Sequence, residues 1–452
     1  MVGFALRAAI ILTNPIIWGG DSVIHLFNRF ALLQGHQLPL LQVLIAAVSW
    51  FSLDPTVVQF MIAAFGSVAG LGFYYVVADL LGEQWALPAA LLFATHPLLV
   101  AVSTVPFQEM LMLAGLLFAF HFFYTDRMAL SSICLALACL TRFEAWAACP
   151  VFAVAYFWRN GRSAWGVLLF GWAPLAWIFA HQGLASTGHF VIERSLSIWR
   201  LQRYVYLGWI TAKFTPIPVL LLAAAGAWLL ARRRIGWRWW MQIAFVSLFA
   251  LAIPFSAHGI APDPERYVSS REVHIFICFT LLLSAAGLTQ WPRWNRWIVA
   301  SGMSLGIIGS FWYVRVETLQ PEAQLDYAAA QFLDRSVQTG ERALLLTNPV
   351  TAEAARLYLD KARETGGEAG LRQAKAEMRD LAAAPPDYQR VVVHSRLARE
   401  RLLAPPAADC AEWVAVWNDY PGVVSELEAQ PVQVLRAGKK SVSIFRRVCS
   451  TF

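Results

Sequence analysis

Long apolar stretches recur through the first 316 residues of this chain, and they constrain its fold more than any other feature. Hydrophobic residues make up 58% of the 452 residues and charged residues only 14%, whereas an ordinary soluble domain is about 25% charged. A soluble core could not enclose that much apolar surface, so we expect lipid to be the solvent for most of the chain. The same composition excludes disordered, fibrous and disulfide-scaffold proteins.

A membrane-spanning helix needs about 20 mostly apolar residues. The stretch 38–53 is apolar but lies between two loops, and we predict an interfacial helix there. The remaining stretches predict an α-helical multi-pass membrane protein with about eleven spans, several of them short. These spans are expected near 3–17, 55–79, 85–101, 109–125, 128–141, 145–158, 164–181, 214–231, 239–256, 271–289 and 296–315.

Charge is distributed unevenly along the chain. Residues 1–316 contain 19 Lys and Arg and 11 Asp and Glu, whereas residues 317–452 contain 17 and 18. We therefore predict a transmembrane domain over 1–316, followed by a small soluble α/β domain over 317–452. Arginines in the membrane loops explain the pI of about 9.2, so we expect the lipid bilayer rather than nucleic acid as the partner.

The segment 128–158 allows either one long helix or two short helices that meet near Arg142 and Glu144. Two helices put the arginines of the short loops on one side of the membrane. Because short basic loops mark the cytoplasm, we prefer two. Those arginines are Arg127, Arg159, Arg162, Arg232, Arg233, Arg234, Arg238, Arg293 and Arg296.

The same orientation sorts the acids of the membrane domain. Asp79, Glu83 and Asp126 are predicted on the cytoplasmic side of the membrane. The acids predicted outside are Asp21, Asp54, Glu109, Glu144, Glu193, Asp263, Glu265 and Glu272. We therefore expect the active face and the C-terminal domain to be extracytoplasmic, in a protein of the inner (plasma) membrane.

The pattern changes after Pro321. Short strands are predicted over 343–346, 390–394 and 413–417, with a hairpin over 432–448 around Gly438. Helices are predicted over 351–364 and 371–384. The glycines at 366–370 follow no strand and are accompanied by no lysine, so we interpret them as a linker rather than a phosphate loop.

Six cysteines are present and form no metal-binding pattern. Four lie in apolar stretches and are interpreted as inert core residues: Cys134, Cys139, Cys149 and Cys278. Cys410 and Cys449 lie in the soluble part, and they could pair if that part is extracytoplasmic.

Three polar elements, each with an acidic residue, lie at the ends of spans that are predicted to face outside. Asp21 follows the first span and is a candidate general base or metal ligand, although capping the helix from Val23 is an alternative. Glu109 opens a span, where favourable interaction with the helix dipole is the alternative. Arg142 could bind a phosphate through its fork, or could simply pair with Glu144 or lipid headgroups.

A fourth polar element precedes the tenth span. His258, Glu265, Arg266 and Tyr267 lie there, followed by Arg271, and together they supply cations, an acid and an aromatic ring. A dense polar loop of this kind is also typical of a plain connector. The predicted outer loop 183–213 adds Lys213 as a further cation, while its other basic residues suit lipid headgroups.

The order of these elements resembles the GT-C superfamily of membrane glycosyltransferases. The shared features are an acid after span one, the stretch HLFNRFALLQGHQLPLLQVLIAA, Pro97 in the third span, Glu109 opening the fourth, a Thr-Arg-x-Glu element and an ERY motif. The pattern is most similar to the polyprenyl-phosphate-sugar-dependent branch, which includes protein O-mannosyltransferases and aminoarabinose transferases. The resemblance covers roughly residues 1–316. One departure is that Asp21 is followed by Ser22, where many relatives have a second acid.

The resemblance implies an inverting transfer of a monosaccharide from a polyprenyl-phosphate carrier to a hydroxyl acceptor of the cell envelope. Asp21 would be the general base, and Arg142, Lys213, Arg266 and Arg271 would stabilise the leaving phosphate. Other expected substrate-binding residues are Glu109, Glu144, His258, Glu265 and Tyr267. A divalent cation, Mg²⁺ or Mn²⁺, is left open, with Asp21 and Glu109 as its possible ligands.

Two other classes of protein fit part of the pattern. One is a multi-pass transporter or flippase of a lipid-linked or anionic substrate, and the other is a non-catalytic envelope-assembly protein. Transporters often show internal repeats and polar residues near the midplane of the bilayer. No repeat is evident here, and the charges gather at one surface, so the enzyme is the preferred hypothesis.

Overall fold

The computed structural model describes residues 1–14, 38–52, 55–160, 165–180, 201–256, 273–293, 295–319, 343–346, 413–417, 431–437 and 440–446, with 325, 328 and 332. The chain divides into two compact units. One comprises Met1–Pro15 and Leu32–Val314, and the other Ile16–Ala31 and Arg315–Phe452.

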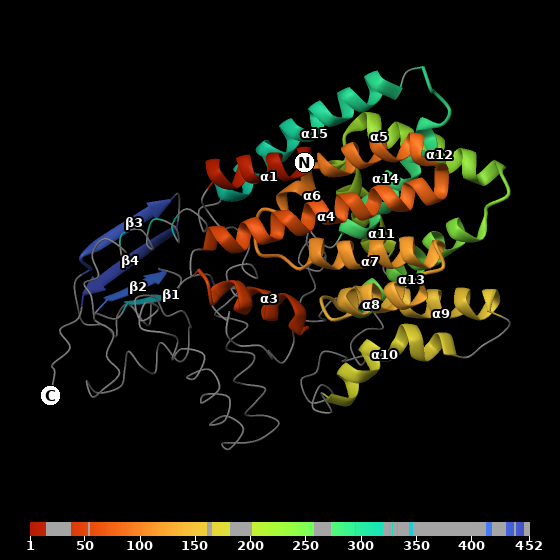
Figure 1. Ribbon diagram of the computed structural model, residues 1–452. Helices are drawn as coiled ribbons and strands as arrows, with labels where there is room; N and C mark the ends of the chain where they lie inside the picture. The colour runs from red at the N-terminus through yellow and green to blue at the C-terminus, as the bar shows by residue number, and fades with distance from the viewer. Residues whose placement is uncertain are drawn as a thin grey trace. The chain divides into compact units, whose positions relative to one another are not determined.

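The first unit is a bundle of helices that run roughly along one direction (Figure 1). Its first half contains α1 (Val2–Thr13), α3 (Pro39–Ser49), α4 (Pro55–Leu81), α5 (Glu83–Ala94), α6 (Pro97–Ala101), α7 (Glu109–Tyr124), α8 (Met128–Cys139), the 3-10 helix η1 (Phe143–Ala147), α9 (Ala148–Arg159) and α10 (Trp165–Ala180). Its second half contains α11 (Leu201–Phe214), α12 (Ile217–Arg232), α13 (Trp237–Ser256), α14 (His274–Leu288) and α15 (Asn295–Thr318).

A helix occupies each stretch that the sequence predicted as a span. Among the described helices, two are long and apolar enough to cross a membrane by length and composition, namely Thr56–Leu81 with mean hydropathy 1.8 and Asn295–Thr318 with 1.4. The other helices in these stretches are shorter or less apolar, so the number of spans stays a prediction. The interfacial helix expected over 38–53 is present as α3, and its position at an interface also stays a prediction.

Two expectations for the helices were wrong. The third span, predicted as one helix over 85–101, breaks at Thr95 and His96, because Pro97 at the start of α6 disfavours a helical conformation of the residue before it. The predicted outer loop 183–213 is partly helical, since its last residues form most of α11. In contrast, the two short helices preferred for 128–158 are confirmed as α8 and α9.

Close backbone contacts hold the bundle together. α4 packs on α5 and α7, α7 packs on α8, and α12 packs on α14. Glycines permit the last of these contacts, because a Cβ added at Gly226 would lie 1.9 Å from the backbone oxygen of Leu283. A Cβ added at Gly287 would lie 2.1 Å from the backbone oxygen of Leu222. Small residues at such contacts are typical of helices packed within a membrane.

The second unit contains a four-stranded mixed sheet in the order β1-β2-β4-β3. β1 (Ala343–Leu346) pairs in parallel with β2 (Trp413–Trp417), and β4 (Lys440–Arg446) pairs antiparallel with both β2 and β3 (Gln433–Ala437). Residues 441–445 of β4 are all buried, so both faces of this strand are covered.

The sheet confirms the strands predicted over 343–346 and 413–417 and the hairpin within 432–448. A parallel pair such as β1 and β2 needs a crossover connection, which is usually helical. The two predicted helices, the strand 390–394 and the glycine-rich linker lie outside the described residues. The α/β class of this unit therefore stays a prediction.

Candidate active site

Glu109 is the first residue of α7, and its side chain is fully buried. The first turn of a helix exposes unsatisfied backbone N–H groups and the positive end of the helix dipole, which favour a carboxylate. The dipole interaction considered from the sequence is therefore present. It does not exclude a second role, because a buried charge also needs a partner.

That partner comes from the turn between α8 and α9. Arg142 has an extended backbone (φ −147°, ψ 144°) and caps η1, so its side chain leaves the axis of α8. Its Nη1 donates to Glu109 Oε1 at 2.8 Å, and its Nε lies 3.1 Å from both Oε1 and Oε2 of Glu144. These three residues form the carboxylate–arginine cluster, in which one guanidinium lies between two carboxylates.

The electrostatics of the cluster keep Glu144 ionised. Burial by itself would raise the pKa of Glu144, but the charge of Arg142 and the hydrogen bonds donated by its guanidinium outweigh burial and lower the pKa to about 2. A smaller contribution comes from His274, the buried first residue of α14. The cluster thus lies near the N-terminal ends of α7, η1 and α14, where helix dipoles favour negative charge.

Aromatic side chains and two further helices surround the turn. Phe143 and Trp146 stack edge to face with 5.0 Å between ring centroids, and they pack on buried Leu38 and Trp177. The indole Nε1 of Trp146 donates to the carbonyl oxygen of Cys139 at 2.9 Å. The backbone N–H of Leu40 in α3 donates to the carbonyl oxygen of Leu140 at 3.1 Å. Apolar and aromatic side chains therefore surround the turn that carries the carboxylate–arginine cluster.

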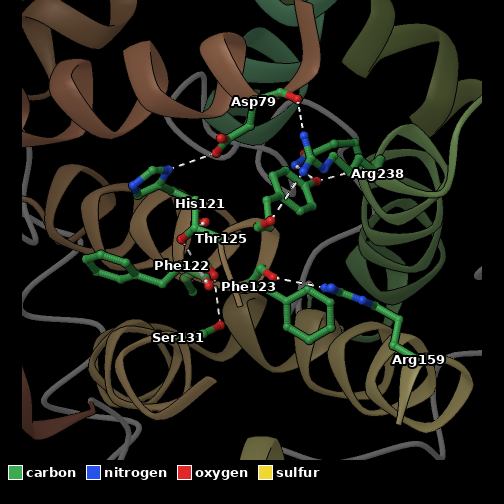
Figure 2. Close-up of polar contacts among 11 residues, drawn as sticks. Asp79, His121, Phe122, Phe123, Thr125, Ser131, Arg159 and Arg238 are labelled. Atoms are coloured by element: carbon green, nitrogen blue, oxygen red, sulfur yellow. Dashed lines mark hydrogen bonds and ion pairs between the residues drawn. The ribbon is translucent and has the colours of Figure 1, made fainter. Parts of the chain in front are cut away.

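A second polar cluster lies at the opposite end of α7 (Figure 2). Asp79 at the end of α4 pairs with His121, with Nδ1 and Oδ2 2.8 Å apart. Arg238 in the first turn of α13 donates to the carbonyl oxygen of Asp79. Arg159, the last residue of α9, donates to the carbonyl oxygen of Phe123 and pairs with Asp126.

These two clusters agree with the way the sequence sorted the charges. Asp79 and Asp126 lie with Arg159 and Arg238 at one end of the bundle, and Glu109 and Glu144 lie at the other. Because a helix rises about 1.5 Å per residue, the 16 residues of α7 separate its two ends by about 24 Å. This is less than the roughly 30 Å of a bilayer core.

The other predicted site residues are not all placed. Lys213 is exposed near the end of α11, where its Nζ lies 5.0 Å from the ring centroid of Trp209 and 5.4 Å from that of Phe214. Within the described residues, these aromatic rings are its contacts. Six predicted site residues lie outside the described residues: Asp21, His258, Glu265, Arg266, Tyr267 and Arg271.

The sequence analysis missed a buried arginine in the first helix. Arg7 donates from Nε to Ser103 Oγ at 2.5 Å, and from Nη1 to the carbonyl oxygens of Gly3 at 2.7 Å and Ala94 at 3.2 Å. A Cβ at Gly66 would lie 2.6 Å from the Nε of Arg7, so glycine leaves room for the guanidinium. The signal that could have found Arg7 is a charged residue inside an apolar stretch.

A buried histidine was also missed. His96 lies at the break between α5 and α6, and its Nε2 is 3.2 Å from Thr215 Oγ1. Arg7 thus binds Ala94 and Ser103, on the two sides of the Thr95–His96 break, to α1, and His96 binds the break to Thr215 between α11 and α12. Both residues hold the segment that leads into Glu109.

The described residues do not present a ligand set for a divalent cation. No group of three or more His, Cys, Asp or Glu side chains occurs among them. Oε1 of Glu109 and both carboxylate oxygens of Glu144 already accept hydrogen bonds from Arg142. Asp21, the other possible ligand considered from the sequence, lies outside the described residues, so the divalent cation stays a prediction.

The fold is similar to that of two solved structures. ArnT from Cupriavidus metallidurans bound to undecaprenyl phosphate superposes with a TM-score of 0.63 at 13% sequence identity, covering 98% of this chain and 96% of ArnT. The apo state of the same protein gives a TM-score of 0.62 at 13% identity, with the same coverage. No protein-family model and no curated protein matches the sequence. The overall fold of this chain is therefore similar to that of ArnT.

Proposed function

We propose that this chain is an integral-membrane glycosyltransferase. It moves a monosaccharide from a polyprenyl-phosphate carrier to a hydroxyl group of an envelope lipid, glycan or protein. The observation that carries the proposal is the similarity of fold to ArnT, which extends over 98% of this chain. That structure is of ArnT bound to undecaprenyl phosphate.

The proposed reaction is a single displacement with inversion. Asp21 takes the proton from the acceptor hydroxyl, whose oxygen attacks the anomeric carbon of the donor sugar. The bond between that carbon and the phosphate oxygen breaks, and the electron pair leaves with the polyprenyl phosphate. One carboxylate suffices for this step, unlike a retaining hydrolysis, which uses two.

The leaving phosphate gains negative charge, which nearby cations stabilise. Arg142 is the described candidate for this role, and Glu109 and Glu144 orient its guanidinium. Lys213, Arg266 and Arg271 are the further proposed cations. Because charge interactions strengthen as water is excluded, the largely buried guanidinium of Arg142 would be more effective than an exposed cation.

We place the active face and the C-terminal unit outside the cytoplasm. The support is the basic residues at the opposite end of the bundle, where Arg159 and Arg238 lie. Nucleotide sugars are not normally supplied on the extracytoplasmic side, whereas a lipid carrier brings the activated sugar to that face. The donor is therefore a polyprenyl-phosphate monosaccharide.

The test is transfer by the purified protein in nanodiscs, with each donor supplied in turn and envelope extract as acceptor. We expect transfer from a polyprenyl-phosphate monosaccharide and none from a nucleotide sugar. The matched control is Arg296→Ala, which removes an exposed arginine at the start of α15 and leaves the carboxylate–arginine cluster intact. Transfer from a nucleotide sugar, in preparations free of lipid-linked sugar, would contradict the proposal.

A further inference from the structure

Two cysteines flank the turn that carries Arg142. Cys139 is the last residue of α8, and Cys149 is the second residue of α9. Their sulfur atoms lie 3.5 Å apart, and both side chains are buried, with exposed fractions of 1% and 9%. No sequence pattern connects the two cysteines, since both fall in apolar stretches interpreted as inert core.

The geometry is close to that of a disulfide. A sulfur–sulfur bond is about 2.05 Å long, so the two sulfur atoms need to approach by about 1.5 Å. Other contacts hold the two helix ends together. The indole of Trp146 donates to the carbonyl oxygen of Cys139, and the backbone N–H of Arg142 donates to that of Ala138.

We propose that Cys139 and Cys149 form a redox-active pair that closes as a disulfide across the turn. The two thiols react with an external disulfide, RSSR. The products are the Cys139–Cys149 bond and two molecules of RSH, so that the cysteines are oxidised and the external disulfide is reduced. The bond closes a loop that contains both Arg142 and Glu144.

The location of the pair gives the reaction its oxidant. Disulfides form and persist in oxidising compartments outside the cytoplasm, and the turn lies on the face that we propose is extracytoplasmic. The inference rests on the proposed function only for this source of oxidant. Exchange needs an accessible thiolate, so the bond forms most readily while the α8–α9 hairpin is being inserted and packed.

The bond would restrict the segment that supplies Arg142. In the reduced protein, hydrogen bonds, the ion pairs and packing hold the turn, whereas in the oxidised protein a covalent link joins the ends of α8 and α9. A disulfide stabilises mainly by restricting the unfolded chain. Oxidation should therefore raise the melting temperature and leave Arg142 better positioned for each turnover.

The experiment is redox mapping of the wild-type protein in native membranes. The protein is denatured in the presence of one alkylating reagent, so that buried free thiols are blocked as well; it is then reduced, and newly released thiols are labelled with a second reagent of different mass. A parallel sample is first treated with diamide. Peptide mass spectrometry then assigns each cysteine, and Cys134 and Cys278 serve as internal controls, because neither contacts another sulfur among the described residues.

We expect Cys139 and Cys149 to carry the second label together after diamide, while Cys134 and Cys278 carry the first. In Cys139→Ala, Cys149 should return to the first label, whereas Cys134→Ala should leave the pair unchanged. Continued first labelling of both cysteines after diamide overturns the inference, as does linkage of Cys149 to another cysteine. Because no sugar transfer is measured, failure here is distinct from failure of the proposed activity.

The state of the pair before diamide tests the source of oxidant separately. Second labelling in untreated membranes supports closure in the cell. If both cysteines carry the first label in untreated membranes and the second label after diamide, the pair is redox-active. That result overturns its closure in the cell by an extracytoplasmic oxidant. A thermal melt of the protein with and without reductant completes the test. An unchanged melting temperature would overturn the role of the disulfide in stabilising the protein.

Discussion

Glu109 and Arg142 are 33 positions apart in the chain, and their side chains form an ion pair with 2.8 Å between Oε1 and Nη1. The carboxylate is fully buried and the guanidinium is 15% exposed. Removing one member of such a pair leaves a buried charge uncompensated, which is more costly than losing a surface ion pair.

Arg142→Met should therefore lower the free energy of unfolding by about 3–5 kcal/mol and abolish transfer. Arg142→Lys keeps the charge but cannot bind both carboxylates through a planar fork, so it should recover part of the stability and little of the rate. Thermal melting in detergent and the donor assay measure the two effects. The control Arg296→Ala should change stability by less than about 0.5 kcal/mol. A stable and active Arg142→Met protein would contradict the assignment.

The depressed pKa of Glu144 predicts a pH dependence. A group whose folded pKa lies below its unfolded value stabilises the protein above the unfolded pKa, and this stabilisation is lost as the pH falls through the folded pKa. The folded pKa is about 2 and the ordinary value is 4.5. The melting temperatures of wild type and Glu144→Gln should thus differ by a constant amount between pH 7 and about pH 5. The difference should shrink as the pH falls from about 4.5 to about 2, and a difference that grows there would be inconsistent with the ion pair.

Asp21 is the proposed base, and its substitution separates chemistry from folding. Asp21→Asn keeps the size of the side chain and removes its ability to accept a proton. The rate of transfer should fall by about 100-fold or more, with normal accumulation in the membrane and an unchanged melting temperature. Ser22→Ala is the neighbouring control and should retain activity. Near-normal turnover by Asp21→Asn would remove this residue from the mechanism.

The contact between α12 and α14 gives a prediction about stability. Gly226→Ala and Gly287→Ala each place a Cβ about 2 Å from a backbone oxygen of the facing helix, and backbone cannot yield as a flexible side chain can. Each should cost about 1–3 kcal/mol or more, seen as a lower melting temperature. Gly208→Ala in α11 is the matched control, because nothing lies within 4 Å of its added Cβ. That variant should be neutral or gain about 0.5–1 kcal/mol.

Orientation can be tested in intact cells. We expect a cysteine placed at position 366 to react with a membrane-impermeant thiol reagent before lysis, because the C-terminal unit is proposed to be extracytoplasmic. A cysteine at Arg233, in the exposed loop after α12, is the opposite-side control and should react only after lysis. The reverse pattern would invert the proposed topology.

Local sequence patterns predicted most of the helices and strands. Apolar stretches located the membrane helices, and the alternation of short strands located β1, β2 and the β3–β4 hairpin. The division of 128–158 into two helices came from the distribution of loop arginines rather than from hydropathy, which is continuous there. The break at Thr95 and His96 was missed because the apolar pattern runs through it, and Pro97 alone marks it.

The candidate site could be predicted only in part. Glu109, Arg142 and Glu144 were each identified from their positions at the ends of spans. The pairing of Arg142 with Glu144 was among the alternatives drawn from the sequence and is present. The ion pair of Arg142 with Glu109 depends on the packing of α7 against α8, which no local pattern contains. Arg7 and the Cys139–Cys149 contact have the same origin, since each depends on side chains brought together from different helices.

The α8–α9 hairpin has a consequence for the surrounding lipid. Each helix has 12 residues, about 18 Å at 1.5 Å per residue, and each exposes large apolar side chains such as Ile133 and Val154. A hydrophobic surface shorter than the bilayer core is matched by local thinning of the membrane. Lipid beside this hairpin would be compressed, and headgroups there would lie closer to the depth of Arg142. If Arg142 contacts the donor phosphate as proposed, this thinning would bring the phosphate closer to Arg142 before it binds.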